Sequence, residues 1–126
     1  MAKRIYIATP VNARKEAILD EKRAAAYLRV KELEYLICKS VNGAEFSEFH
    51  SAFDNDIAPL RLSSKELPSE AVIMGKCIQR VMECDMVVFD RGWTSSKGCK
   101  VEHQTAFEYE KDIYMINWDG TVYIYD

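Results

Sequence analysis

Hydrophobic and polar positions change in blocks along the chain, and the blocks predict strands and helices in turn. Ile5–Ala8 is a short apolar run of β-formers that ends before Thr9, as a buried parallel strand does. Arg14–Lys39 is rich in Ala, Leu, Glu, Lys and Arg, which are strong helix formers. Such a helix would exceed about 30 Å, so the pattern leaves a break within it open. Val41–Gly43 predicts its end.

The segment that follows, Val41–Pro68, carries two conflicting signals. Four apolar residues recur there at helical spacing: Phe46, Phe49, Phe53 and Ile57. An alternating chain of strands and helices instead requires a strand near Glu45–Ala52, and we favour the strand. Asp54–Pro68 holds two of the three prolines and predicts a loop.

The second half of the chain begins with a helix that Ser69 is placed to cap. One apolar face of this helix is formed by Ala71, Met74, Ile78, Val81 and Met82. Asp85–Asp90 then predicts a second buried strand, and Arg91–Gly98 a polar loop that contains two glycines. A helix is expected over Cys99–Lys111.

The last elements read as a β-hairpin. Ile113–Ile116 and Thr121–Tyr125 are rich in β-formers, and Asp119-Gly120 between them is a turn signal. The order of elements predicts an α/β fold with a mainly parallel sheet of about five strands and helices on both faces. With 126 residues and no repeat or linker-like segment, we expect one domain over residues 1–126.

Composition and charge narrow the possible functions. Hydrophobic residues make up 48% and charged residues 29%, as in ordinary globular proteins. The 17 Lys and Arg against 20 Asp and Glu give a net charge of −3, which argues against long nucleic acids and anionic membranes as partners. No apolar stretch approaches the roughly 20 residues of a membrane span. The apolar part of the N-terminus is too short for a signal peptide, so we expect a cytoplasmic protein.

Two groups of residues raise the question of a metal site. Cys99 and His103 are four residues apart on a predicted helix, but the other cysteines, Cys38, Cys77 and Cys84, have no spacing that completes a ligand set. Asp54 and Asp56 form an acidic cluster without supporting spacing. We therefore expect reduced thiols, a solvated acidic loop and no metal.

Ligands of parallel α/β sheets bind beyond the carboxyl ends of the strands, which points to Thr9–Asn12 and Asp90–Gly98. The second loop opens a helix whose first amides are unpaired and suit an anion such as phosphate, with Glu102 one turn further on. The alternative is a plain turn with an acidic residue near the helix start. Trp93 either stacks on a base or sugar or covers the core, and Asp90 either contacts a ligand or caps the turn.

In these segments the chain resembles the nucleoside 2-deoxyribosyltransferase-like superfamily, in particular a short branch known only as a domain of unknown function. Ile5–Val11 is similar to the family's first strand and loop, "IYIAGPM". Cys84–Phe89 and the residues that follow resemble the branch signature "CDAVVLLPGW…S.G…EH"; these residues are Gly92, Trp93, Ser96, Gly98, Glu102 and His103. The resemblance runs from Ile5 to Ile116 and is weakest over Val41–Pro68.

The resemblance implies a Rossmann-like, flavodoxin-like fold and cleavage of an N-glycosidic bond in a nucleoside or nucleotide. Glu102 would attack the anomeric carbon to form a glycosyl-enzyme that water or a second base resolves. Ser96 corresponds to the residue that binds phosphate in the similar 2′-deoxynucleoside 5′-phosphate N-hydrolases. The implied substrate-binding residues are Tyr6, Thr9, Pro10, Asp90, Trp93, Ser96 and Gly98. No cofactor is implied, and relatives form dimers or larger homo-oligomers.

The sequence departs from the family pattern at two positions. Cys77 stands where active relatives carry an aspartate, and a thiol is a poor substitute for an acid that helps the base to leave. Thr9 replaces a common glycine. The alternative is therefore a non-catalytic nucleotide-binding or sensor module of the same fold, or an interaction protein with a vestigial pocket. Three aromatic residues near the C-terminus would either anchor an interface or pack on the chain's own sheet: Trp118, Tyr123 and Tyr125.

Overall fold

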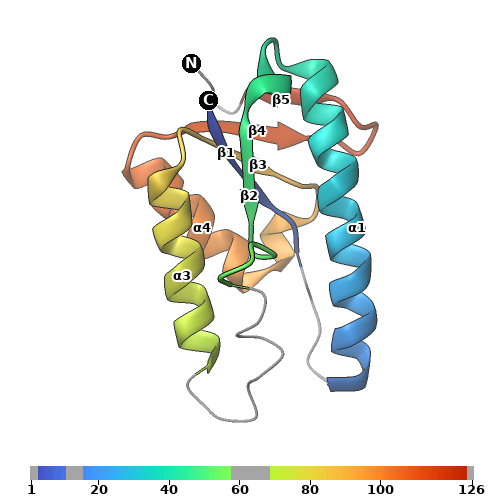
Figure 1. The fold of residues 1–126 in the computed structure, drawn as a ribbon, viewed down its shortest axis with the longest axis vertical. Helices are drawn as coiled ribbons and strands as arrows, with labels where there is room; N and C mark the ends of the chain where they lie inside the picture. The colour runs from blue at the N-terminus through green and yellow to red at the C-terminus, as the bar shows by residue number, and fades with distance from the viewer. Residues whose placement is uncertain (1–2, 11–15, 58–68, 125–126) are drawn as a thin grey trace.

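The computed structural model describes residues 3–10, 16–57 and 69–124, with the backbone alone for 16–23 and 69–71. Within them a five-stranded sheet has the order β2-β1-β3-β4-β5 (Figure 1). The strands are β1 (Arg4–Ala8), β2 (Glu48–Ser51), β3 (Met86–Phe89), β4 (Asp112–Ile116) and β5 (Val122–Ile124). Neighbouring strands are parallel except for β5, which is antiparallel to β4. The predicted α/β fold with a mainly parallel sheet is confirmed.

Three helices cover the described sheet: α1 (Glu16–Ser40), α3 (Ser69–Glu83) and α4 (Lys97–Glu108). Helix α1 runs unbroken for 25 residues, so the break that its length left open does not occur. It ends where predicted, before Gly43, whose positive φ of 82° leads into a short 3-10 helix (Ala44–Phe46). No helix in the described ranges is both long and apolar enough to cross a membrane.

The core consists of two layers because β1 and β3 are buried on both faces. Tyr6 and Phe89 pack with Val81 of α3 and Ala106 of α4 on one face. A second set packs against α1 on the other face: Ile5, Ile7, Leu33, Ile37 and Val88. Successive side chains of a strand point to opposite faces, so residues next to each other on β1 and β3 serve different layers.

Several predicted boundaries are confirmed and others are wrong. The strand expected near Glu45–Ala52 is present as β2, and the competing helical interpretation of this segment is wrong. Helix α3 includes Ser69 as its first residue, whereas the sequence placed Ser69 at the cap before the helix; β4 and β5 form the expected hairpin. Helix α4 begins at Lys97 rather than Cys99 because Ser96 supplies its N-cap. It ends at Glu108 rather than Lys111, and Glu110 beyond its end has a positive φ of 55°. Residues 58–68 of the predicted loop lie outside the described residues.

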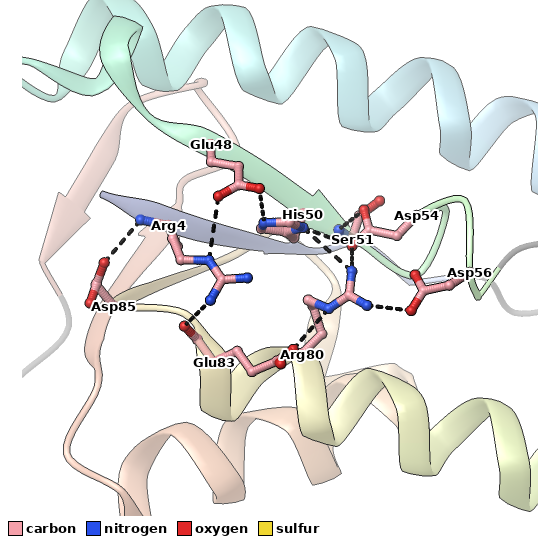
Figure 2. Close-up of polar contacts among 9 residues, drawn as sticks. All are labelled: Arg4, Glu48, His50, Ser51, Asp54, Asp56, Arg80, Glu83 and Asp85. Atoms are coloured by element: carbon pink, nitrogen blue, oxygen red, sulfur yellow. Dashed lines mark hydrogen bonds and ion pairs between the residues drawn. The ribbon is translucent and has the colours of Figure 1, made fainter. Parts of the chain in front are cut away.

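The acidic segment after β2 is solvated in part, as expected at the exposed Asp56, but both of its aspartates are also bound by an arginine, which the sequence did not predict. Arg80 of α3 forms ion pairs with Asp54, Asp56 and Glu83 (Figure 2). Asp54 also lies 2.9 Å from Nδ1 of His50 on β2. These contacts hold the segment after the edge strand against α3.

A second set of polar contacts extends this network to the start of β1. The Arg4 guanidinium lies 3.4 Å from Glu48 and donates to the carbonyl oxygen of Glu83, while its backbone N–H donates to Asp85 (Figure 2). His50 Nε2 lies 3.2 Å from Glu48. The edge strand β2 therefore carries charged groups on its exposed side, which discourages pairing with another sheet.

We predict that Arg80→Gln lowers the free energy of unfolding by about 1–2 kcal/mol, because it removes charged hydrogen bonds from three carboxylates. The Arg80 guanidinium lowers the pKa of Asp56 in the folded protein. That contribution to stability is present above the unfolded pKa of about 4 and is lost as the pH falls through the lower, folded pKa.

Urea unfolding between pH 7 and pH 3 measures both effects. The wild-type protein should lose more stability on acidification than Arg80→Gln. The exposed Lys39→Gln removes the same charge and should leave stability and its pH dependence near wild type; an equal loss in this control would contradict the role of the network.

Candidate functional site

A cleft lies at the carboxyl edge of the sheet, where the chain order reverses between β1 and β3. The strand β1 is flanked by β2 on one side and β3 on the other, so the segments after β1 and β3 diverge at this point. The cleft has a volume of about 420 Å³. Its lining residues are Thr9, Pro10, Ala25, Ala26, Arg29, Asp90, Arg91, Gly92, Ser95 and Trp118.

An ion pair between α1 and the end of β3 forms one wall of the cleft. Asp90 is 4% exposed, and its two oxygens accept hydrogen bonds from Arg29 at 2.9 and 3.0 Å. Oδ1 also accepts from the backbone N–H of Arg91 at 2.8 Å. Hydrogen bonding to Asp90 raises the pKa of Arg29. Asp90 therefore caps the turn, as one of the sequence-based alternatives held, and it is also engaged by an arginine.

The lining of the cleft also contains an aromatic ring that is held by a second arginine. The guanidinium of Arg91 lies 5.2 Å from the ring centre of Trp118 and donates to its carbonyl oxygen at 3.0 Å. Trp118 is 77% exposed and lines the cleft, a position that neither sequence-based alternative anticipated. Thr9 Oγ1 is buried and has no hydrogen-bond partner within the described part of the chain. Tyr125 lies outside the described residues.

Glu102 lies on the other side of the sheet, in the layer covered by α3 and α4. Its side chain is buried beside the phenol of Tyr6 and the thiol of Cys77. Burial, followed by the Glu102 carboxylate and the Cys77 thiol, raises the pKa of Tyr6 well above 10. Tyr6 therefore keeps its proton at physiological pH and can donate a hydrogen bond to a carboxylate.

The start of α4 positions this carboxylate. Ser96 is buried, and its side chain accepts a hydrogen bond from the N–H of Cys99 at 3.3 Å. Gly98 lies inside the first turn of the helix, where a Cβ would meet Met74 Sδ at an ordinary 3.7 Å. The described packing therefore does not require glycine at position 98.

Trp93 covers the edge of the core and stacks on a histidine. Its ring lies 4.4 Å from that of His103 at an interplanar angle of 17°, and both rings contact Phe89. Burial lowers the pKa of His103, which therefore stays neutral at physiological pH.

The structure does not support a metal site at Cys99 and His103. Burial, followed by the Glu102 carboxylate, raises the pKa of Cys99 to about 12, which disfavours the thiolate that binds metals. Within the described ranges no three His, Cys, Asp or Glu side chains are grouped so as to hold a metal ion. The four cysteines are free thiols.

The residues nominated from sequence therefore form two groups. Thr9, Pro10 and Asp90 line the cleft on the α1 side. The others belong to the α3/α4 side and are not among the residues that line the cleft: Tyr6, Trp93, Ser96, Gly98 and Glu102. The sequence interpretation missed Arg29, Arg91 and Trp118 as site residues. The sequence does contain one indication of Arg29, because this charged residue interrupts the face of the predicted helix Arg14–Lys39 that carries Ala25, Leu28, Leu33 and Leu36.

The fold and the cleft define an α/β protein with a cleft at the switch point of a mainly parallel sheet. Residues 3–115 match the model of a family described as a domain of unknown function (DUF4406), and the chain belongs to this family. No curated protein matches the chain.

We predict that Asp90→Asn lowers the free energy of unfolding by about 2–4 kcal/mol, because it removes the buried one of the two carboxylates that pair with the half-buried Arg29 guanidinium. Equilibrium unfolding in urea measures the loss. Glu32 binds the same guanidinium from an exposed position, so Glu32→Gln is the matched control and should change stability by less than about 0.5 kcal/mol.

The double variant Arg29→Gln/Asp90→Asn tests whether the two residues act as a pair. Its loss should be smaller than the sum of the single losses, with a coupling of about 1–3 kcal/mol. Strictly additive losses would contradict the pairing.

Proposed function

We propose that this protein cleaves the N-glycosidic bond of a nucleoside or nucleotide, by hydrolysis or by deoxyribosyl transfer, with Glu102 as the nucleophile. The observation that carries the proposal is the buried Glu102 carboxylate beside the protonated phenol of Tyr6. A sheet order of β2-β1-β3-β4-β5 supports the flavodoxin-like form of the Rossmann-like fold that the resemblance implies.

The chemistry uses a carboxylate on one face of the sugar. A Glu102 oxygen would bond to the anomeric carbon while the bond to the base nitrogen breaks, and the base leaves with that electron pair and takes up a proton. Water or an acceptor base would then bond to the anomeric carbon while the bond to the Glu102 oxygen breaks, which gives the free sugar or a new nucleoside and restores the carboxylate. Tyr6 is placed to donate a hydrogen bond to Glu102 and orient it.

The start of α4 supplies groups for the sugar or its phosphate. Its first amides have no partners within the helix, and Ser96 lies at its N-cap. Thr9 and Pro10, which follow β1, would contact the substrate from the cleft. Trp93 has one ring face on His103 and would close the site next to α4.

The second candidate is a nucleotide-binding module without turnover, and one observation favours it. Cys77, which stands in place of an aspartate, is 3% exposed and lies in the same buried cluster as Tyr6 and Glu102. A thiol is a weak hydrogen-bond donor and would give little help to a departing base.

We predict that the pure protein releases free base from at least one member of a panel of nucleosides, deoxynucleosides and their 5′-monophosphates. Chromatography of the reaction mixture measures the released base. Glu102→Gln should lower the rate by about 100-fold or more, because an amide cannot form the glycosyl ester. Glu45→Gln, an exposed carboxylate in the 3-10 helix after α1, is the control and should keep the wild-type rate.

Two outcomes decide between the candidates. Base release that is unchanged in Glu102→Gln rules out this residue as the nucleophile. Calorimetric binding of a nucleotide without any release over hours favours the binding module.

A further inference from the structure

Trp118 is largely exposed, yet the turn that carries it between β4 and β5 is held by several hydrogen bonds. The backbone N–H of Asn117 donates to the carbonyl oxygen of Thr121 at 2.8 Å, and their side chains are joined at 2.9 Å. The N–H of Gly120 donates to Asn117 at 3.0 Å, and Arg91 binds the carbonyl oxygen of Trp118 itself. The indole ring therefore lines the cleft on a backbone that is ordered before any ligand arrives, which lowers the entropic cost of binding.

Arg91 brings a positive charge to this ring without an acidic partner. Its Nη1 donates to the carbonyl oxygen of Trp118, and its guanidinium carbon lies 5.2 Å from the ring centre. Within the described part of the chain, no carboxylate forms an ion pair with Arg91, and its Nε and Nη2 make no hydrogen bond. Adjacent N–H groups of a guanidinium match two oxygens of a carboxylate or phosphate, so this pair of donors suits an anion.

The lining of the cleft is positively charged although the chain as a whole is acidic. Among the described lining residues the charged ones are Arg29, Asp90 and Arg91. The Asp90 oxygens already accept hydrogen bonds from Arg29 and from the backbone N–H of Arg91. This carboxylate therefore compensates the guanidinium of Arg29 and leaves that of Arg91 uncompensated. The cleft attracts acids in a protein whose net charge is −3.

We infer that the cleft binds a small molecule in which a planar aromatic ring carries an acidic group. The ring stacks on the exposed part of the Trp118 indole, and the acidic group accepts hydrogen bonds from Nε and Nη2 of Arg91. The volume of about 420 Å³ is within the range of small-molecule sites, roughly 300–1,000 Å³. Glu102 is not among the residues that line the cleft, so the inference goes beyond the proposed cleavage reaction and stands without it.

Tryptophan fluorescence of the Trp93→Phe variant tests the stacking, because the chain has two tryptophans and this variant keeps only Trp118. Adenosine 5′-monophosphate and nicotinate each carry a ring and an acid. Adenosine and nicotinamide lack the acid, while ribose 5-phosphate and acetate lack the ring. At least one of the two ring acids should quench the emission, with a dissociation constant about tenfold or more below those of its neutral and ringless counterparts.

Calorimetry on the wild-type protein should give the same order of affinities. The ring acid that binds more tightly shows whether the cleft prefers a phosphate or a carboxylate. The inference is overturned if neither ring acid binds, or if each binds no more tightly than its neutral counterpart.

Substitutions of the two cleft residues test the contacts one at a time. Arg91→Gln and Trp118→Leu should each raise the dissociation constant of the tighter ring acid by about tenfold or more, and Arg91→Gln should also remove the preference for the acid over its neutral counterpart. Lys39 and Tyr35 form another exposed cation–ring pair, 4.6 Å apart and outside the cleft, so Lys39→Gln and Tyr35→Leu are the matched controls and should bind as the wild type does.

The variant Glu102→Gln separates this inference from the proposed cleavage. It should bind the ring acid with the wild-type dissociation constant, whatever its effect on base release. Loss of binding in Glu102→Gln, or unchanged binding in Arg91→Gln or Trp118→Leu, would contradict a site built on Arg91 and Trp118.

Discussion

The structure depends on the burial of β1 and β3 on both faces. Each strand is only four or five residues long, yet its alternate side chains supply two separate core layers. The same alternation separates polar groups at the carboxyl edge. Phe89 belongs to the α3/α4 layer, so the Asp90 side chain next to it faces α1 and binds Arg29. Tyr6 of β1 faces the α3/α4 layer, where its phenol lies beside Glu102. One short sheet thereby presents two chemically different sides at one edge.

The two sides differ in how charge is compensated. On the α1 side, Asp90 and Arg29 neutralise each other, and Arg91 lies against an indole ring. On the α4 side, the buried Glu102 carboxylate lies beside the phenol of Tyr6 and the thiol of Cys77. The net charge of −3 for the whole chain does not reveal this difference between the two sides of the sheet. The overall charge therefore does not describe the local arrangement, which has two guanidiniums on the α1 side and one buried carboxylate on the α4 side.

Sequence patterns predicted the elements well where burial alone determines structure. Continuous apolar runs identified β1 and β3, and chain order favoured β2 over a helix. The start of α4 was misplaced because glycine at position 98 signals a loop, while the stabilising contact comes from the hydroxyl of Ser96. Arg29 and Asp90 are 61 residues apart, and only the folded sheet brings them together. The alternation along β3 predicts that Asp90, which directly follows Phe89, faces the other side of the sheet from Phe89.

The Arg29–Asp90 pair ties the occupancy of the cleft to a distant part of the molecule. Arg29 lies near the middle of the 25-residue α1, and it has no second buried acceptor among the described residues, only the exposed Glu32. A ligand group that took the oxygens of Asp90 would have to supply Arg29 with a replacement anion or release it. A group that engaged Asp90 would therefore compete with the contact that joins the middle of α1 to the end of β3.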